Sequence, residues 1–336
     1  MVSTYNLSEL ILIEATPEQV IITNRNSFVE WGAPHLTLEE YLSRERLLSS
    51  LPFTSKNFTV WILVPRSTPE TTTNILSSCE TFIRPALVQP SQKLYCYSIA
   101  SVFTPPEHRK NGYASYMMEM LGKKLKENFQ GVGFSFLYSD IGTEFYSRLG
   151  WKVFGHKEIQ FNIENENENL NDITSDIANA IPLSWTDVED LTKYDCSLIE
   201  NEIVVSSAKY GAVVLPTFEC FEWLFARTNG DDQIIGFVIW TYNFQEEILQ
   251  ILRFRSLNTN VTKSLIKRAK LYASHYNFKK ITVWNPNLKL FTDTIIIEGG
   301  ELVERTKSLP SLAWYNNDKG FNDDVEWILN ENYAWC

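Results

Sequence analysis

Arg109-Lys-Asn-Gly-Tyr-Ala114 is the stretch around which this chain of 336 residues is organised. It follows Leu94–Phe103, which is apolar or small on both faces and therefore predicts a central strand covered on both sides. Beyond it, Gly112 to Glu127 places apolar residues at helical spacing. A helix N-terminus offers unpaired N–H groups and partial positive charge, and Gly112 and Ala114 leave room for a phosphate. The stretch therefore predicts a strand, a turn and a helix that together hold a pyrophosphate.

The residues before this stretch predict strands and two helices. Leu10–Ala15 and Asn57–Pro65 are expected as strands, and another is expected around Ile75–Ile83. Thr16 with Gln19, and Thr37 with Glu40, have the spacing of capping boxes, so each pair should open a helix.

The residues after it predict one further strand, a short helix and a last strand. These are Phe134–Tyr138, Thr143–Leu149 and Trp151–Phe161. Two other nucleotide-binding patterns are missing from the sequence: there is no G-x-x-x-x-G-K-[ST], and Gly131-Val-Gly133 lacks the third glycine of a dinucleotide turn.

The second half of the chain repeats the order of the first. Helical segments are expected around Trp185–Leu191 and Phe218–Arg227, followed by strands at Ile234–Tyr242 and Ile248–Arg255. A helix near 261–276 and a strand near 281–284 complete the series. This order fits either a degenerate duplicate of the first half or the common alternation of strands and helices. No glycine opens the later helix, so we expect no second phosphate site.

An acidic, polar segment divides the two halves and is typical of a linker. We therefore expect domains at residues 1–161 and 180–336, joined by a linker at 162–179.

Composition excludes several classes of function. A net charge of −11 argues against nucleic acid as the main partner. No apolar run approaches the roughly 20 residues that a membrane helix needs. Five scattered cysteines without pairing motifs favour a reducing compartment, so the cytoplasm is expected. Four dispersed histidines have no ligand spacing, and no metal site is expected.

Two motifs in this region carry a family resemblance. Ser101-Val-Phe-Thr-Pro-Pro-Glu-His-Arg-Lys-Asn-Gly-Tyr-Ala114 matches [Arg/Gln]-x-x-Gly-x-[Gly/Ala] after a strand, and Ser139–Trp151 matches the later aromatic-Tyr and Gly-aromatic pattern. With both motifs the chain resembles the GNAT-type N-acetyltransferase superfamily. The chain is most similar to the fungal lysine N-acetyltransferases of lysine degradation. This narrower resemblance lies in the residues of Glu14–Glu18 and Leu137–Gly142 and in the added C-terminal domain. The resemblance implies an α/β fold with a mixed central sheet flanked by helices, and a second C-terminal α/β domain.

The resemblance also implies a donor and a set of site residues. Acetyl-CoA would be held by backbone N–H groups at the end of the first strand, around the turn and at the start of the second motif, and Tyr146 would protonate the departing thiolate. The expected acetyl-CoA-binding residues are Val102, Phe103, Thr104, Arg109, Lys110, Asn111, Gly112, Tyr113, Ala114, Ser115 and Ser139.

The sequence contains several candidates for the general base and does not single one out. An alkyl amine with a pKa of ~10.4 must lose a proton before it attacks. Leu94–Thr104 contains no acidic residue and no histidine, although some members of the superfamily carry a glutamate there. Glu107 and His108 lie too close to the turn, where a solvated loop role is expected. Asp140 is the candidate base, with helix capping as its alternative, and the C-terminal carboxylate of Cys336 is another option.

For the acceptor, the resemblance implies free L-lysine at its side-chain nitrogen. Another amine, such as a polyamine or a protein lysine, is the alternative acceptor, and a non-catalytic acetyl-CoA-binding protein is the alternative class. Trp31 is expected either to line the acceptor site or to lie in the core. Glu219 and Glu222 are candidates to hold the α-amino group. The sequence predicts no oligomeric state.

Overall fold

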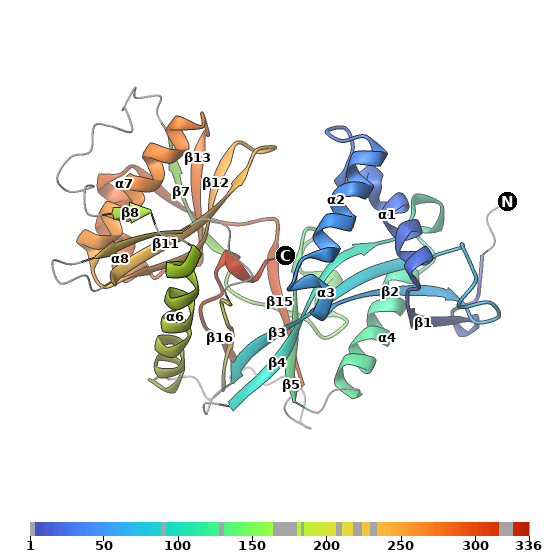
Figure 1. Cartoon of the computed structure of the whole chain (residues 1–336). Coiled ribbons are helices and arrows are strands. Elements are labelled where there is room, and N and C mark those ends of the chain that lie inside the picture. The colour runs from blue at the N-terminus through green and yellow to red at the C-terminus, as the bar shows by residue number, and fades with distance from the viewer. Residues whose placement is uncertain are drawn as a thin grey trace. The chain divides into compact units, whose positions relative to one another are not determined.

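A computed structural model describes residues 4–88, 92–127, 131–163, 180–182, 185–205, 210–217, 224–228, 234–315 and 325–335. The chain forms two compact units (Figure 1). The first contains Met1–Val88, Gln92–Val153 and Leu309–Val325, and the second contains Gln89–Ser91, Phe154–Ser308 and Glu326–Cys336. None of the helices within the described ranges is both long enough and apolar enough to cross a membrane.

The first unit is built on a mixed sheet with the strand order β1-β2-β3-β4-β5-β15-β6. Neighbouring strands are antiparallel except β4 and β5, which are parallel. The strands are β1 (Leu10–Glu14), β2 (Phe58–Pro65), β3 (Ser77–Val88), β4 (Gln92–Phe103), β5 (Val132–Ser139), β6 (Lys152–Val153) and β15 (Leu309–Trp314).

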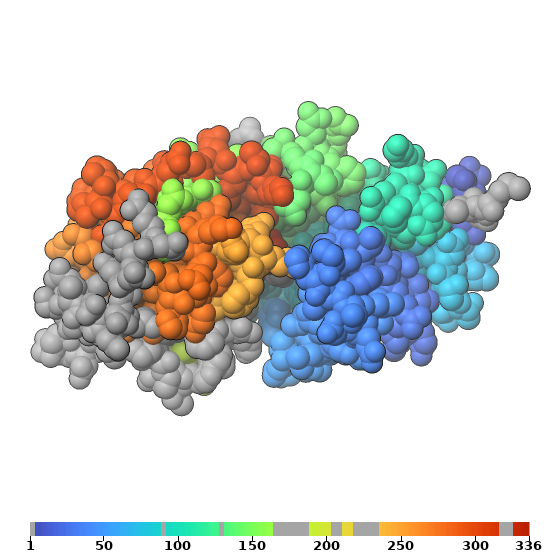
Figure 2. Space-filling view, turned by 90° about the horizontal axis from the view of Figure 1, so that it is seen from above, coloured from blue at the N-terminus to red at the C-terminus, as the bar shows by residue number. Residues whose placement is uncertain are grey.

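Helices cover both faces of this sheet (Figure 1). They are α1 (Pro17–Trp31), α2 (Leu38–Ser50), α3 (Thr54–Asn57), α4 (Tyr113–Glu127) and α5 (Glu144–Ser147), with short 3-10 turns at Leu7–Glu9 and Pro106–His108. Both predicted capping boxes, at Thr16 and Thr37, are confirmed. The helices α1 and α2 lie side by side at the surface of the first unit (Figures 1 and 2).

The alternation of side chains along β2 explains why helices cover both faces of the sheet. Trp61 and Leu63 belong to a core cluster with Met117 of α4, whereas Val60 and Ile62 pack with residues of α1 on the other face. Successive residues of a strand point to opposite faces, so a single apolar strand contributes side chains to two hydrophobic cores. The candidate active site has residues on both faces of this sheet.

The second unit has a sheet with the order β14-β7-β13-β12-β11-β10-β8. Its strands β11, β12 and β13 repeat the arrangement of β3, β4 and β5, because β11–β12 is antiparallel, a helix follows, and β12–β13 is parallel. The elements of this unit are β7 (Lys157–Asn162), β8 (Ala180–Pro182), α6 (Trp185–Val205), β9 (Tyr210–Val214), β10 (Leu224–Thr228), β11 (Ile234–Asn243), β12 (Ile248–Ser256), α7 (Thr259–His275), β13 (Lys280–Trp284), α8 (Leu288–Ile297), β14 (Gly300–Glu304) and a 3-10 turn at Asn332–Ala334. In addition, β9 pairs with β16 (Val325–Trp327).

Two sequence predictions were wrong. The single strand expected at 151–161 is two strands in two sheets, since β6 pairs with β15 while β7 pairs with β13 and β14. The helix expected at 218–227 is contradicted by β10, which starts at Leu224 and pairs with β11 and β8; residues 218–223 lie outside the described part. In both cases long-range strand pairing overrides the local pattern.

The boundary between the units also differs from the expected one at residue 161. It falls between Val153 and Phe154, and β15 returns from far along the chain to lie between β5 and β6. The predicted linker falls almost wholly on residues 164–179, which are outside the described part.

Candidate active site

A bulge near the end of β4 marks the site. The β3–β4 register passes from Glu80 opposite Ala100 to Ser78 opposite Phe103, so β4 contains one residue more than β3 over this span. Ser101 within it has a φ of 52°, a left-handed conformation that is uncommon outside glycine. Bulges of this kind bend a strand, re-aim its side chains and are frequent beside active sites.

The parallel pairing of β4 with β5 ends beside this bulge. Its last pair is Ile99 with Leu137, although β4 continues to Phe103 and β5 to Ser139. The backbone groups of β4 from Ala100 onward are therefore not paired with β5, and this is where the expected thioester-binding residues Val102 to Thr104 lie.

The predicted phosphate turn has the backbone that the sequence requires. Lys110 and Gly112 have φ of 66° and 78°, and α4 begins directly afterwards at Tyr113. A Cβ added to Gly112 would meet no atom within 4 Å, so open space lies over the turn. A positive-φ turn at the N-terminus of a 15-residue helix, with open space above it, fits the pyrophosphate of acetyl-CoA. Lys110, Asn111, Gly112, Tyr113, Ala114 and Ser115 are the residues that would surround it.

Arg109 ties this turn to the end of β4. Its Nε donates to the carbonyl of Thr104 at 3.0 Å, and its guanidinium lies 5.7 Å from the ring centre of Phe103. A second contact to Glu30, at 3.7 Å, joins two half-exposed side chains and contributes little to stability. Asn111 Nδ2 donates to the carbonyls of His108 and Arg109, and these two local hydrogen bonds stabilise the turn.

His108 packs beside the turn, against the first residue of α4. It is buried, its Nε2 lies 3.0 Å from Asn74 Oδ1, and its ring packs edge-on against Tyr113. Burial lowers the pKa of His108, which favours the neutral ring. The solvated role expected for this residue is therefore wrong, because it is a buried partner of the segment before β3.

Tyr146 lies on the α4 side of the sheet. It is 7% exposed, and Phe145 packs edge-on against it with ring centres 4.9 Å apart. Burial raises the pKa of Tyr146, and neighbouring Cys79 and Asp140 add to the effect. The phenol therefore stays protonated at neutral pH, as a proton donor must.

The second predicted motif lies at the end of β5. Ser139 is buried and donates from Oγ to the carbonyl of Gly142 at 2.7 Å, across the turn that leads to α5. Asp140, the base candidate from the sequence, is exposed in this turn. Ser139 and Asp140 thus precede Tyr146 in the second motif, and Asp140 lies near enough to Tyr146 to affect its pKa.

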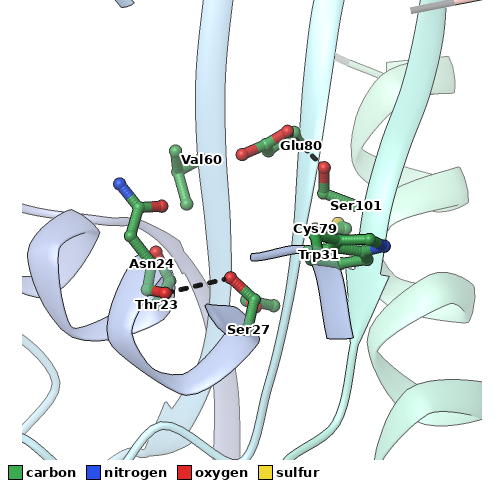
Figure 3. Close-up of a pocket in the computed structure, with 9 residues that line it drawn as sticks. Thr23, Asn24, Ser27, Trp31, Val60, Cys79, Glu80 and Ser101 are labelled. Carbon is green, nitrogen blue, oxygen red and sulfur yellow. Dashed lines mark hydrogen bonds between the residues drawn. The ribbon is translucent and has the colours of Figure 1, made fainter. Parts of the chain in front are cut away.

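A recess on the opposite face of the sheet contains a carboxyl group that the sequence reasoning missed. Its centre is Glu80 of β3, which accepts a hydrogen bond of 2.6 Å from Ser101 Oγ (Figure 3). Burial raises the pKa of Glu80 to about 7, Ser101 lowers it and Glu45 raises it further. The recess is lined by Thr23, Asn24, Ser27, Trp31, Val60, Ser78, Cys79, Glu80 and Ser101 (Figure 3).

Trp31 therefore lies at this recess rather than in the core. It is the last residue of α1, is 37% exposed, and its ring centre lies 5.7 Å from that of Phe103. The recess is small and open to solvent, and its space of about 10 Å³ has room for about one water molecule. Ligand pockets usually measure roughly 300–1,000 Å³, so at most the tip of a small substrate fits here.

Other predicted residues are not placed. Glu219, Glu222 and Cys336 lie outside the described residues. Within the described ranges, no three His, Cys, Asp or Glu side chains are grouped so that they could hold a metal ion.

Two models of known protein families match parts of this chain. A family model described as "Acetyltransferase (GNAT) domain" matches residues 70–154, and one described as "LYC1 GNAT-like C-terminal domain" matches residues 229–336. The chain therefore resembles the GNAT-type N-acetyltransferase superfamily in both of these regions and is an acyltransferase. Acetyl-CoA is the donor that GNAT acetyltransferases use.

A relative that matches almost the whole chain makes the resemblance more specific. The chain is 25% identical to a protein named lysine acetyltransferase from Yarrowia lipolytica, over 96% of this chain and 98% of that protein. The resemblance to fungal lysine acetyltransferases predicted from the sequence is thus confirmed.

Solved structures share the fold. A probable N-acyltransferase of unknown function from Enterococcus faecalis V583 matches with a TM-score of 0.59 at 14% identity, over 91% of this chain and 72% of that chain. A GCN5-related N-acetyltransferase from Anabaena variabilis ATCC 29413 matches with a TM-score of 0.56 at 12% identity, over 91% and 73%. At these identities the likeness concerns the fold alone.

Proposed function

We propose that this protein transfers acetyl from acetyl-CoA to the side-chain amine of free L-lysine, as a step of lysine degradation in the cytoplasm. The observation that carries the acceptor side is the carboxyl group of Glu80, which lies in a small open recess beside the bulge of β4. The name of the Yarrowia lipolytica relative supports lysine as the acceptor. The buried thiol of Cys79, which is not in a disulfide, supports a reducing compartment.

The donor side is assigned to the turn and the bulge. In this proposal, N–H groups from Lys110 to Ser115 bind the pyrophosphate, and those of Val102 to Thr104 bind the thioester carbonyl. Donors aimed at a carbonyl stabilise the negative charge that develops on its oxygen during attack. Acetyl-CoA supplies an electrophilic thioester when bound.

Glu80 is assigned as the general base in place of Asp140. About one alkyl amine in 10³ is neutral at pH 7, so attack needs a group that removes the proton. A carboxyl group with a pKa of about 7 is half ionised at neutral pH, and it is a stronger base than an ordinary glutamate. Asp140 is exposed in the turn after β5 and acts on Tyr146, the group assigned here as the proton donor.

The reaction then uses one proton acceptor and one proton donor. Glu80 takes a proton from the ammonium group, and the freed lone pair of nitrogen forms a bond to the carbonyl carbon. The bond from that carbon to sulfur breaks, and Tyr146 gives its proton to the departing thiolate. The positively charged nitrogen then loses its second proton, which restores the phenol of Tyr146 and leaves a neutral amide. Acid and base thus act from opposite faces of the sheet, since Tyr146 packs with the α4 cluster and Glu80 faces α1.

The decisive experiment compares acceptors. Purified protein is incubated with acetyl-CoA and L-lysine, spermidine or a lysine-rich peptide, thiol release is followed, and mass spectrometry locates the acetyl group. We expect turnover with L-lysine and acetylation of the side-chain nitrogen. Nε-acetyl-lysine, which offers only its α-amine, is the matched control and should not react.

The other outcomes decide between the alternatives. Turnover with spermidine or peptide but not with L-lysine would replace the acceptor and keep the reaction. Acetyl-CoA binding without turnover on any amine would contradict the catalytic proposal.

A further inference from the structure

Ser101 joins the bulge of β4 to the carboxyl group of Glu80. Its φ of 52° is a conformation that a serine keeps only where the surrounding structure holds it. Such strain is often found at functional sites, and here it coincides with a specific side-chain contact.

The bulge explains how Ser101 reaches Glu80. Ala100 lies directly opposite Glu80 in the register, so the two share a face of the sheet. In a regular strand the next residue would point to the other face. The extra residue of the bulge breaks this alternation, and Ser101 Oγ comes within 2.6 Å of Glu80 Oε2. Figure 3 shows the two side chains directed at each other across the recess.

We propose that Ser101 is a positioning residue for the base, whose hydroxyl holds the Glu80 carboxylate in the recess and favours its ionised form. The proposal rests on the role of Glu80 given above and adds the residue that controls its proton.

The charges around Glu80 show why such a donor is needed. Glu45 of α2 is a nearby carboxylate that opposes the ionisation of Glu80. Tyr41 of α2 and Cys79 of β3 also lie near Glu80, which raises their own pKa values, so both stay uncharged at neutral pH and offer Glu80 no positive charge. Arg44 could favour ionisation, but its Nε and Nη2 are engaged with Glu45 at 3.0 and 2.8 Å.

Ser101 is therefore the source of stabilisation for the ionised form. Burial raises the pKa of Glu80 to about 7, Glu45 pushes the same way, and the hydrogen bond from Ser101 opposes both. Without this bond the carboxyl group would hold its proton at neutral pH and could not accept one from the amine.

The test is the pH profile of kcat/KM for the amine in Ser101→Ala. Activity requires ionised Glu80, so the acidic limb should move to higher pH by about one unit, from the usual strength of a hydrogen bond to a charged group. The acceptor's own ionisation is common to both proteins, so the difference between their profiles reports the enzyme. At pH 6.5 the rate should fall up to about tenfold, and at high pH it should recover.

Ser101→Gly distinguishes the effect of losing the hydroxyl from the effect of strain in the backbone. It also removes the donor but relaxes the positive φ, so it folds even where alanine is poorly tolerated. Ser101→Gly and Ser101→Ala should shift the limb equally. Ser50→Ala removes a hydroxyl of α2 that lies outside the recess and donates to the carbonyl of Leu47, so it should leave the midpoint of the limb in place.

Failure of this inference differs from failure of the proposed function. An unshifted limb in both Ser101 variants, with activity still lost in Glu80→Gln, would overturn the role of Ser101 alone. Unchanged activity in Glu80→Gln would overturn the base, and the role of Ser101 with it.

Discussion

Arg253 Nε donates to Asp195 Oδ2 at 2.8 Å inside the second unit, and both side chains are only 2% exposed. Asp195 comes from α6 and Arg253 from β12, so this ion pair joins a helix to the middle of the sheet. Arg253 also contacts Glu331, and Glu331 accepts from the backbone N–H of Phe254 at 2.9 Å. The C-terminal segment is thereby fixed to the same strand.

The first prediction concerns this pair. Asp195→Ala leaves a buried guanidinium short of a partner and should lower the free energy of unfolding by about 3–5 kcal/mol, measured by denaturant titration. Glu189→Ala removes an exposed partner of Lys193 on the same helix and should cost less than about 1 kcal/mol. Equal effects from the two variants would show that the buried network does not stabilise the unit.

The second prediction uses the raised pKa of Glu80. Because the folded-state pKa is about 7 and the ordinary value is 4.5, ionising the buried carboxyl weakens the native protein as pH rises between these values. Glu80→Gln should therefore be more stable than the native protein at pH 8, by about 3 kcal/mol. At pH 4 this advantage should vanish. A stability difference independent of pH would contradict the burial of a titrating group.

The third prediction concerns the proton donor. Tyr146→Phe keeps the buried ring and its packing against Phe145 but removes the phenol. We expect kcat to fall about 10²-fold or more while the KM for acetyl-CoA changes little, in steady-state kinetics with L-lysine. An unchanged kcat would remove Tyr146 from the reaction, and a large rise in KM alone would assign it to binding.

The fourth prediction tests the phosphate turn. Gly112→Ala forces a side chain into a φ of 78° and into the open space over the turn, so the Kd of acetyl-CoA should rise at least tenfold in calorimetry. Gly299→Ala, at a φ of 66° in the second unit and with equally open space, is the matched control. It should cost similar stability, about 1–2 kcal/mol, without weakening acetyl-CoA. Equal loss of affinity in both would point to a general folding defect.

Much of the donor side was predictable because its signals are local. The spacing from Arg109 to Ala114 and the apolar face of the following helix depend on neighbours a few residues apart. The capping residues Thr16 and Thr37 act over one helical turn, and their helices begin where expected. Backbone preference and helix geometry act within such short stretches, so sequence alone determined the strand, the turn and the helix that define the superfamily.

The acceptor side was decided only by tertiary structure. Glu80 is a single carboxylate in a predicted strand, and its neighbours in sequence do not reveal that it faces Ser101, 21 residues later. A one-residue bulge in β4 brings them together, and burial among α1, β2 and β4 raises its pKa. The insertion of β15 between β5 and β6 is likewise set by pairing over more than 150 residues. Sequence determined which local elements form; strand register and burial, which depend on distant contacts, decided which side chains meet and how acidic they are.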